Sequence, residues 1–328
     1  MKKNVAIVAG GYSSEIVISL KSAAGLSTFI DKERYNLYVV TLTKEEWAVQ
    51  LPDGTCSAID KNDFSFQEHG VIRKFDFAYI TIHGTPGEDG RLQGYFDMIG
   101  MPYSSCDVLV SAVTFNKYVC NHYLRNFGVK VANSIRLLKG QTIGTDEAIC
   151  RLGLPLFVKP NVGGSSFGTT KVKSPEQLQE AIIKAFAEGD EVILEQFIEG
   201  TEVTSGCYKT KDRAVLLPLT EVVTENEFFD FDAKYNGQVD EITPARLSPE
   251  MTRKIKEETS KIYDCLGASG LIRVDYIIPS DGEPVMLEVN TTPGMTATSF
   301  VPQQIRAAGL DIKEVMTEII EDALLKRK

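Results

Sequence analysis

The sequence predicts an α/β protein in which an N-terminal parallel βαβ domain is followed by two parts of α+β character. Three observations lead to this class: strands and helices alternate over the first hundred residues, a glycine-rich segment joins two strands near residue 160, and a polar-faced hairpin lies near residue 280. A chain of 328 residues has room for two or three domains. Its composition, 43% hydrophobic and 24% charged, is ordinary for a soluble globular protein.

The N-terminal domain is expected to span residues 1–103. Its apolar runs and the helical pattern between them predict a strand at 4–9, a helix from about Ser14 to Phe29, and strands at 36–43 and 75–82. This alternation indicates a parallel sheet. Because ligands bind such sheets at the carboxyl ends of the strands, the polar loops 10–15 and 83–90 are expected to line a site.

A central domain is expected at 104–190 and a C-terminal domain at 191–328. Residues 224–246 are polar without clear periodicity and are expected to form a loop over a site. The chain ends in a helix predicted from about Asp311. Between 104 and 197 the pattern predicts helices at 111–127 and 175–188 and short strands at 131–138, 155–160, 169–173 and 191–197.

Charge and cysteine usage narrow the class of protein. The net charge of −10 argues against general binding to nucleic acid or to anionic membranes. No apolar stretch approaches the length needed to cross a bilayer, and the N-terminal apolar run is too short for a signal peptide. The six cysteines are scattered without a Cys-x-x-Cys pair, which favours reduced thiols in a cytoplasmic protein.

The hairpin between 271 and 290 carries the most informative pattern. If Asp281-Gly282 forms a two-residue turn, position 275 lies opposite 288 and position 273 lies opposite 290. Arg273, Asp275, Glu288 and Asn290 then form one polar patch, since side chains two apart on a strand share a face. Two opposed carboxylates repel each other, and a divalent metal between them reverses that interaction. Hard oxygen ligands of this kind suit Mg²⁺.

A solvated hairpin face is the alternative explanation, because alternating polarity is common in antiparallel pairs. Asparagine is a poor strand former, and its presence at 290 weakens that alternative. The turn Thr291–Gly294 weakens it further, because such a rigid turn can aim backbone N–H groups at a ligand. The metal site is therefore the favoured interpretation.

A second candidate site is the segment from Lys159 to Gly168. A glycine-rich loop between two strands can place N–H groups on phosphate oxygens, although a flexible surface hairpin would have a similar sequence. It is not a Walker A loop, because no Gly-Lys-Ser/Thr follows and no helix begins there. Lys159 at the end of a buried strand favours phosphate binding. Further on, Glu195 and Glu202 bracket Phe197 and Ile198, which is weakly indicative of a slot for adenine and ribose.

Together these segments resemble the ATP-grasp ligases and, within them, are most similar to the D-alanine–D-alanine ligases. The resemblance covers nearly the whole chain and is carried by GGYSSE, HGTPGEDG, VKPNVGGSSFG, LEQFIEGTE, FFDFDAKY, RVDY and LEVNTTPGMTATS. It implies an ATP-grasp fold and the ATP-dependent joining of two D-alanines through a D-alanyl phosphate, for peptidoglycan precursors. It also implies two Mg²⁺ ions, for which Mn²⁺ can substitute, and a cytoplasmic homodimer.

The resemblance assigns roles to individual positions. Glu15 and His83 are expected to hold the first D-alanine, and Ser299 the carboxylate of the second. Arg273 and the Gly294 N–H are expected to stabilise the tetrahedral oxyanion. The two metal ions would be bound by Asp275, Glu288 and Asn290.

The nucleotide and the loop that closes over the site involve a larger set of positions. Ser165 and Tyr235 are expected to join Glu15 in a hydrogen-bonded triad. The base that deprotonates the incoming amine is left open between the intermediate phosphate and a member of this triad. The residues implied to contact ATP are Lys117, Lys159, Gly164, Ser165, Ser166, Glu195, Gln196, Phe197, Ile198, Glu202 and Lys234.

Simpler explanations exist for several of these residues. Glu15 could interact only with the dipole of the helix that it begins, His83 could be an ordinary loop histidine, and Lys117 could be solvated. Glu88 and Asp89 are expected to be structural, and no role is assigned to them.

Four other functions are also consistent with the fold. A D-alanyl-D-lactate ligase is disfavoured by Tyr235 after Lys234, whereas a D-alanyl-D-serine ligase stays open because the choice depends on pocket shape. A different ATP-grasp enzyme is disfavoured by the Glu15 loop and HGTPGEDG. A nucleotide-binding regulator should have lost Arg273 or a metal ligand, and none is lost.

Overall fold

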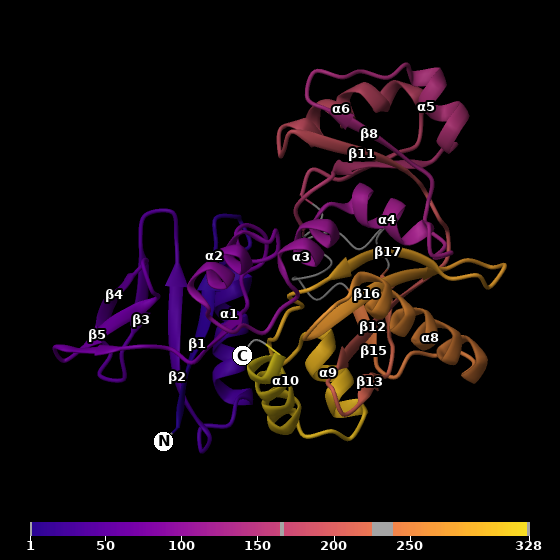
Figure 1. Ribbon diagram of the computed structural model, residues 1–328. Helices are drawn as coiled ribbons and strands as arrows, with labels where there is room; N and C mark the ends of the chain where they lie inside the picture. Colours follow the sequence, from indigo (N-terminus) through magenta and orange to yellow (C-terminus); the bar gives the residue numbers. More distant parts are fainter. Residues whose placement is uncertain (1, 165–166, 225–238, 327–328) are drawn as a thin grey trace.

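The computed structural model describes residues 2–164, 167–224 and 239–326 of the chain (Figure 1). Three sheets organise these residues: one of seven strands in the N-terminal part, one of four strands in the middle, and one of six strands in the C-terminal part. In Figure 1 the four-stranded sheet and its helices stand apart at the top, while the N-terminal and C-terminal parts lie side by side below.

The N-terminal sheet contains the predicted parallel unit and an antiparallel extension. Strand β1 (Lys3–Gly10) pairs in parallel with β2 (Tyr35–Leu42) and with β7 (Phe77–Ile80), and α1 (Ile16–Phe29) connects the first two. Sequence analysis did not place the extension, because its strands are short and separated by turn residues. It consists of β3 (Trp47–Gln50), β4 (Cys56–Asp60), β5 (Ser65–Glu68) and β6 (Val71–Arg73), and α2 (Arg91–Ile99) follows β7.

The helical segments predicted over 111–127 are two separate helices. α3 (Val108–Phe115) and α4 (Lys117–Arg125) are separated at Asn116, whose side-chain oxygen accepts the Val119 N–H at 3.0 Å and so begins the second helix. This break places Lys117 at the first position of α4.

The central sheet is antiparallel throughout, in the order β10-β9-β11-β8. Its helices pack on it to form a core of their own that includes Leu156, Val158 and Leu194. The predicted domain division stays a prediction; β11 lies beyond its boundary at 190, yet pairs within this sheet. The elements are β8 (Ser134–Leu138), α5 (Thr145–Leu152), β9 (Leu156–Pro160), β10 (Thr170–Val172), a 3₁₀ turn (Pro175–Gln177), α6 (Leu178–Phe186) and β11 (Glu191–Gln196).

The C-terminal sheet runs in the order β15-β14-β12-β16-β17, with β13 paired to β12. Most of the loop expected over 224–246, residues 225–238, lies outside the described residues. The expectation is wrong at 239–242, because these residues form a strand along β14. The helix expected from Asp311 is confirmed. The elements are β12 (Thr201–Lys209), β13 (Ala214–Leu216), β14 (Thr220–Thr224), β15 (Val239–Ile242), α8 (Pro249–Leu266), β16 (Leu271–Ile278), β17 (Val285–Asn290), α9 (Phe300–Ala307) and α10 (Ile312–Lys326).

The β16–β17 hairpin has the predicted pairing at its polar end but not the predicted turn. Arg273 pairs with Asn290, and Asp275 with Glu288. The strands, however, are joined by residues 279–284, and the register shifts by one between Asp275 and Tyr276. The bulge compensates for the longer connection, so the polar patch has the register that a two-residue turn would have given.

One hydrophobic core unites the N-terminal and C-terminal parts. It contains Val5, Leu26 and Phe77 from the first part together with Leu271 and Ile319 from the last. Helix α10 lies between the two parts in Figure 1. The N-terminal and C-terminal parts are therefore one packed unit, whereas the central sheet has a separate core.

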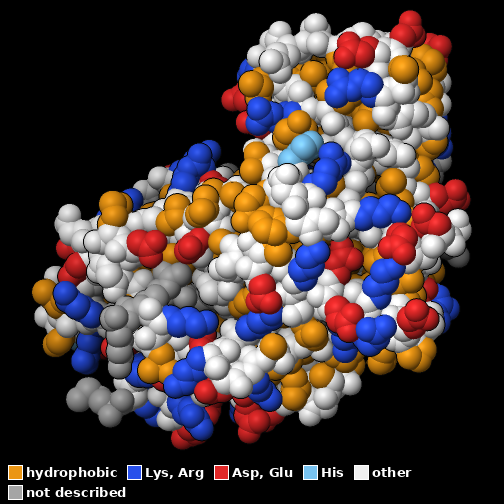
Figure 2. Space-filling view, turned by 45° about the vertical axis from the view of Figure 1, so that its right-hand side comes forward, with side chains coloured by type: hydrophobic (Ala, Val, Ile, Leu, Met, Phe, Trp, Pro, Cys, Tyr) orange, Lys and Arg blue, Asp and Glu red, His pale blue; other side chains and the backbone are white. Residues whose placement is uncertain are grey.

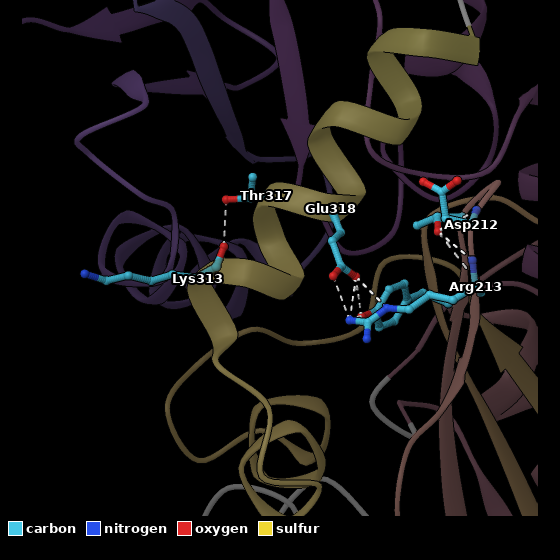
Figure 3. Close-up of polar contacts among 7 residues, drawn as sticks. Asp212, Arg213, Lys313, Thr317 and Glu318 are labelled. Carbon is cyan, nitrogen blue, oxygen red and sulfur yellow. Dashed lines mark hydrogen bonds and ion pairs between the residues drawn. The ribbon is translucent and has the colours of Figure 1, made fainter.

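Polar contacts of α10 reinforce this union on both sides. Figure 3 shows the Glu318 carboxylate accepting hydrogen bonds from Arg213, with Nη2 at 2.7 Å from Oε1 and Nε at 3.1 Å from Oε2. One turn further on, Glu321 accepts from Lys3 Nζ at 2.8 Å and from the Tyr35 hydroxyl at 2.7 Å. The same helix thus contacts β1 and β2 as well as the residues beside β13.

The surface carries charged side chains of both signs. Acidic and basic side chains are interspersed over the face shown in Figure 2. Over the described ranges, every helix is too short or too polar to span a lipid bilayer.

Candidate active site

Two adjoining cavities, of about 1070 Å³ and 770 Å³, lie where the three parts of the chain meet. They share five of the predicted site residues: Glu15, Lys117, Gly164, Arg273 and Glu288. The larger cavity also contains His83, Asn290, Gly294 and Ser299. The smaller one contains Lys159, Glu195, Gln196, Phe197, Ile198, Glu202 and Asp275.

Every predicted site residue that the structure describes therefore lines one of these cavities or both. Four predicted residues, Ser165, Ser166, Lys234 and Tyr235, lie outside the described residues. Residues of the loop before α1 and residues of helix α9 thus line the same cavity, although they are almost 300 positions apart in the sequence.

The polar patch of the β16–β17 hairpin, formed by Arg273, Asp275, Glu288 and Asn290, lies where the two cavities adjoin. Arg273 donates two parallel hydrogen bonds to Asp275, Nε to Oδ1 at 2.9 Å and Nη2 to Oδ2 at 2.8 Å. Asn290 donates to the same Oδ2 at 3.1 Å, and Lys117 Nζ lies 3.9 Å from Glu288 Oε2. Asp275 is only 8% exposed, so these hydrogen bonds offset the cost of burying its polar side chain.

The donor set of this patch fits magnesium. Asp275 and Glu288 are opposed across the hairpin and Asn290 contacts the first of them, which gives three hard oxygen ligands. Within residues 2–164, 167–224 and 239–326, no three His, Cys, Asp or Glu side chains gather as a metal cage. An ion held here would take its remaining ligands from phosphate oxygens and water, as Mg²⁺ at nucleotide sites usually does.

Lys117 is a buried cation beside the glycine-rich loop, not a solvated helix lysine. Its side chain is 12% exposed, and Nζ donates to the Gly163 carbonyl at 2.5 Å. Burial lowers the pKa of Lys117, and the neighbouring Glu288 carboxylate opposes that effect. Asn161, fully buried, fixes the loop to α4 by accepting the Tyr118 N–H at 2.8 Å.

Lys159 and Glu195 form a close ion pair, with Nζ 2.5 Å from Oε2. Glu195 is 3% exposed, and its other oxygen is buried without a hydrogen-bond partner among the described residues. Glu195, which is predicted together with Glu202 to hold the adenine and ribose ends of a nucleotide, thus also pairs with Lys159 from the neighbouring strand β9. An oxygen in this state can still accept a hydrogen bond from a ligand.

An aromatic wall lines the slot beside this pair. The ring centroid of Phe157 lies 5.9 Å from that of Phe197, and Lys171 Nζ lies 3.8 Å from the Phe197 ring centroid. Sequence analysis did not assign Phe157 or Lys171. Phe157 could have been found, because it is two positions from Lys159 on one strand and shares its face. Lys171 gives no such signal.

Glu221 and Arg246 form a second ion pair, at the smaller cavity, that sequence analysis also missed. Arg246 donates Nε to Glu221 Oε2 at 2.9 Å and Nη2 to Oε1 at 2.7 Å. The Arg246 guanidinium lowers the pKa of Glu221. The residues are 25 positions apart; Glu221 lies on β14, and Arg246 follows β15, which pairs with β14.

Glu15 points away from its own helix and toward the glycine-rich loop. It occupies the N-cap position of α1 but makes no side-chain capping bond. A Cβ placed on Gly164 would lie 2.9 Å from Glu15 Oε1, so the loop glycine gives the carboxylate its space. This arrangement favours a functional role for Glu15 over a simple interaction with the helix dipole.

His83 is held neutral next to the guanidinium of Arg273. Burial and the Arg273 charge lower the pKa of His83 to about 4. Its Nε2 is buried and has no hydrogen-bond partner among the described residues. A buried orphan nitrogen that lines a cavity is available to a ligand.

Glu88 belongs to the site, contrary to the expectation that it is only structural. It lines the larger cavity. Its Oε2 accepts the Gly84 N–H at 2.7 Å, and its Oε1 accepts the Thr292 hydroxyl at 2.8 Å. Burial, with the Glu15 charge, raises the pKa of Glu88 to about 7. The neighbouring Asp89 is hydrogen-bonded to Thr85 of its own loop, as expected.

The turn after β17 is held against α1. The Met295 N–H donates to Ser22 Oγ at 3.2 Å, and a Cβ on Gly25 would lie 2.1 Å from the Met295 carbonyl oxygen. Ser299 precedes α9, and its hydroxyl accepts the Thr296 N–H at 3.1 Å. These contacts fix the position of Gly294 at the cavity wall.

Comparison with known proteins agrees with this geometry. The family model described as D-ala D-ala ligase N-terminus matches residues 4–106, and the model described as D-ala D-ala ligase C-terminus matches residues 123–321. The chain is 74% identical over 328 residues to the D-alanine–D-alanine ligase of Parabacteroides distasonis, covering 100% of this chain and 99% of the relative.

Solved structures share the fold. The VanG D-Ala:D-Ser ligase from Enterococcus faecalis superposes with a TM-score of 0.86 at 31% identity, over 98% of this chain and 100% of that one. A D-alanine–D-alanine ligase from Bacillus anthracis complexed with ATP gives a TM-score of 0.79 at 28% identity, over 99% and 98%. The architecture is the ATP-grasp fold, and the chain belongs to the D-alanine–D-alanine ligase family.

Proposed function

We propose that this chain joins two molecules of D-alanine to D-alanyl-D-alanine at the expense of ATP, releasing ADP and phosphate, and so supplies a peptidoglycan precursor. The observation that carries the proposal is the meeting of the two cavities at Glu15, Lys117, Arg273 and Glu288. One cavity offers lysines and an aromatic slot for a nucleotide, and the other offers carboxylates and N–H groups for an amino acid. Phosphoryl transfer between the two ligands would occur where the cavities join.

The reaction has two steps. First, a carboxylate oxygen of one D-alanine attacks the γ-phosphorus of ATP, the bond from that phosphorus to the β,γ-bridging oxygen breaks, and ADP leaves. Second, the amino nitrogen of the other D-alanine loses a proton and attacks the acylphosphate carbonyl carbon. The C–N bond forms, the C–O bond to phosphate breaks, and phosphate leaves. The candidates for accepting the proton are the intermediate phosphate and a member of the proposed Glu15–Ser165–Tyr235 triad.

The chain's own residues supply charge and position for both steps. Lys117 and Lys159 bind phosphate oxygens, because phosphoryl transfer depends on cationic charge and alignment. Arg273 and the Gly294 N–H stabilise the tetrahedral oxyanion, and one such donor typically contributes about 3 kcal/mol. Glu15 binds the ammonium group of the first D-alanine.

The remaining roles concern binding. His83 lies beside the first D-alanine, and Ser299 receives the carboxylate of the second. The nucleotide's adenine and ribose are held by Glu195, Gln196, Phe197, Ile198 and Glu202. The roles proposed for Ser165, Ser166, Lys234 and Tyr235 rest on the family resemblance alone.

Asp275, Glu288 and Asn290 would hold two Mg²⁺ ions, with Mn²⁺ able to substitute. Bound there, the ions supply positive charge that offsets the crowded phosphate oxygens. The support for this assignment is the oxygen donor set of the hairpin and its position beside the two phosphate lysines.

D-serine is a second candidate for the later-binding substrate. The observation that favours it is the structural likeness to a D-Ala:D-Ser ligase at a TM-score of 0.86. The many curated relatives named D-alanine–D-alanine ligase, at up to 74% identity among those compared, favour D-alanine. A homodimer and a cytoplasmic location are also proposed; the family resemblance supports both, and the six free cysteines agree with a reducing compartment.

The experiment is phosphate release by the purified protein with ATP, Mg²⁺ and D-alanine, with the product identified by mass. We expect D-alanyl-D-alanine from D-alanine alone, and its loss in Arg273→Ala. A matched control is Arg246→Ala, which removes a guanidinium at the cavity rim that is not assigned to the oxyanion.

Two outcomes would change the proposal. Phosphate release only after addition of D-serine would replace the second substrate. An absence of ATP turnover with any D-amino acid, by a protein that still binds ATP, would favour a nucleotide-binding regulator.

A further inference from the structure

One buried carboxylate spans the two halves of the substrate cavity. The two oxygens of Glu88 accept hydrogen bonds from distant parts of the chain. The Gly84 N–H of its own loop donates to one oxygen at 2.7 Å, and the Thr292 hydroxyl, 204 positions further along the sequence than Glu88, donates to the other at 2.8 Å. Thr292 is 4% exposed, so solvent does not replace its contact with Glu88. The bridge therefore ties the N-terminal half of the site to the C-terminal half.

Each end of this bridge adjoins a group with a proposed chemical role. Gly84 directly follows His83 in the loop after β7. Thr292 lies two positions after Asn290 and two before Gly294, within the turn after β17. A displacement of either end would alter the distance between the subsite for the first amino acid and the N–H group that faces the oxyanion.

We propose that Glu88 is a positioning residue, which sets the spacing between the His83 loop and the Gly294 turn and so aligns the first substrate with the oxyanion-stabilising groups. The proposal rests on the ligase function proposed above. Glu88 acts through its two hydrogen bonds, without touching the reacting atoms. A misplacement of about 1 Å can cost roughly a hundredfold in rate, which is why such a bridge matters.

The adjacent acidic residue provides the contrast. Asp89 accepts the Thr85 hydroxyl of its own loop at 2.8 Å and pairs with Arg91 at the start of α2. No contact of Asp89 to the C-terminal part is recorded among the described residues. Asp89 thus shares the sequence environment of Glu88 but not its connection across the cavity.

The test is a set of variants at both ends of the bridge. Glu88→Gln keeps both bonds, because its amide oxygen can accept the Gly84 N–H while its amide nitrogen donates to the Thr292 hydroxyl. Glu88→Ala and Thr292→Val each break the bridge. We expect the last two to lower kcat by roughly 10- to 100-fold while the dissociation constant for ATP stays within about twofold, and Glu88→Gln to restore most of the rate.

A double-mutant cycle separates a bridge from two independent effects. Glu88→Ala combined with Thr292→Val should lower kcat no further than Glu88→Ala alone. Thr292→Ser, which keeps the hydroxyl, should behave like the wild type. Asp89→Ala is the matched control and should leave kcat within about threefold of the wild type.

Specific results would overturn the positioning role. These are a Glu88→Gln variant as slow as Glu88→Ala, additive losses in the cycle, or a normal kcat in Thr292→Val. If Glu88→Ala fails to fold, the positioning role is tested by comparing kcat of Thr292→Val with kcat of Thr292→Ser and Glu88→Gln. An inactive wild type that binds ATP would instead contradict the proposed ligase function, whereas an active wild type with unaffected variants contradicts only the role of Glu88.

Discussion

At the scale of single residues, Arg273 both makes a hydrogen-bonded ion pair and lines the site. It pairs through two parallel hydrogen bonds with Asp275, and it lies at the junction of both cavities. A planar guanidinium can make such a bidentate contact and still direct its remaining N–H group elsewhere, which an ammonium group cannot do.

We predict that Arg273→Lys lowers kcat by about 10²- to 10³-fold with little change in ATP affinity, because one oxyanion donor is lost and the nucleotide slot is intact. Steady-state kinetics and ATP titration would measure the two quantities. Arg246→Lys is the matched control and should retain near-normal kcat. A comparable loss of ATP affinity in Arg273→Lys would mean that the guanidinium serves nucleotide binding.

The titration of Glu88 makes a second prediction at this scale. Its pKa is about 7 in the folded protein and near the ordinary value of 4.5 in the unfolded chain. Between these values the folded state binds more protons, so the contribution of Glu88 to stability is fully present below pH 4.5 and is lost as the pH rises through 7. The lowered pKa of His83 affects the pH dependence of stability in the opposite direction. Because His83 is present in both the wild type and a Glu88 variant, the comparison of the two proteins isolates the effect of Glu88.

The difference in unfolding free energy between the wild type and Glu88→Gln should therefore decline from pH 4.5 to pH 7, by as much as about 3 kcal/mol. Urea unfolding at several pH values would measure it. A difference that is constant over this range would show that Glu88 titrates near its ordinary value in the folded protein.

At the scale of secondary structure elements, a helix and a turn approach each other at a glycine. The Gly25 position of α1 leaves no room for a side chain, since a Cβ there would lie 2.1 Å from the Met295 carbonyl oxygen. Backbone cannot move aside as the end of a flexible side chain can. The turn that carries Gly294 is thus positioned by the absence of a methyl group on a helix more than 260 positions earlier in the sequence.

We predict that Gly25→Ala destabilises the protein by about 1–3 kcal/mol and lowers kcat, because the turn after β17 must shift. Gly94→Ala in α2 is the matched control: its new methyl group would meet only Val108 Cγ2, at 3.7 Å, and the gain in helix propensity should stabilise the protein by up to about 1 kcal/mol. Thermal unfolding and steady-state kinetics would measure both. A stable, fully active Gly25→Ala would contradict the close packing.

At the scale of the whole molecule, two of its four hydrophobic clusters define two units. One core joins residues of β1, α1 and β7 to residues of β12, α9 and α10. The other lies within the four-stranded sheet and its helices. The smaller cavity has walls from both units, with Lys159 and Phe197 on one and Arg273 and Glu288 on the other.

We predict that core truncations act on these units separately. Ile319→Ala should reduce hydrogen-exchange protection in both 3–80 and 201–324, whereas Leu156→Ala should reduce it mainly in 134–196, each costing about 2–5 kcal/mol locally. Hydrogen exchange followed by mass spectrometry would measure the effect by segment. Equal loss of protection over the whole chain in both variants would show a single cooperative unit.

The sequence by itself determined the local features of this protein. The parallel unit of β1, α1, β2 and β7 and the alternation of polar and apolar positions in the β16–β17 hairpin could be predicted, because periodicity is a property of neighbouring residues. The opposed pair Asp275 and Glu288 was predicted correctly although the turn was not, since the bulge restored the register. The motifs then indicated the family, and the comparisons confirmed it.

Only the tertiary structure decided which distant groups meet. The role of Glu88, its bond to Thr292, the Glu221–Arg246 pair and the wall formed with Lys171 have no signal at short sequence separation. Each depends on how separate elements pack, and packing also sets the burial that shifts the pKa of His83 and of Glu88. Burial and long-range contact are properties of the folded chain, which is why the sequence could predict residues that line the cavities but not the contacts that hold them in place.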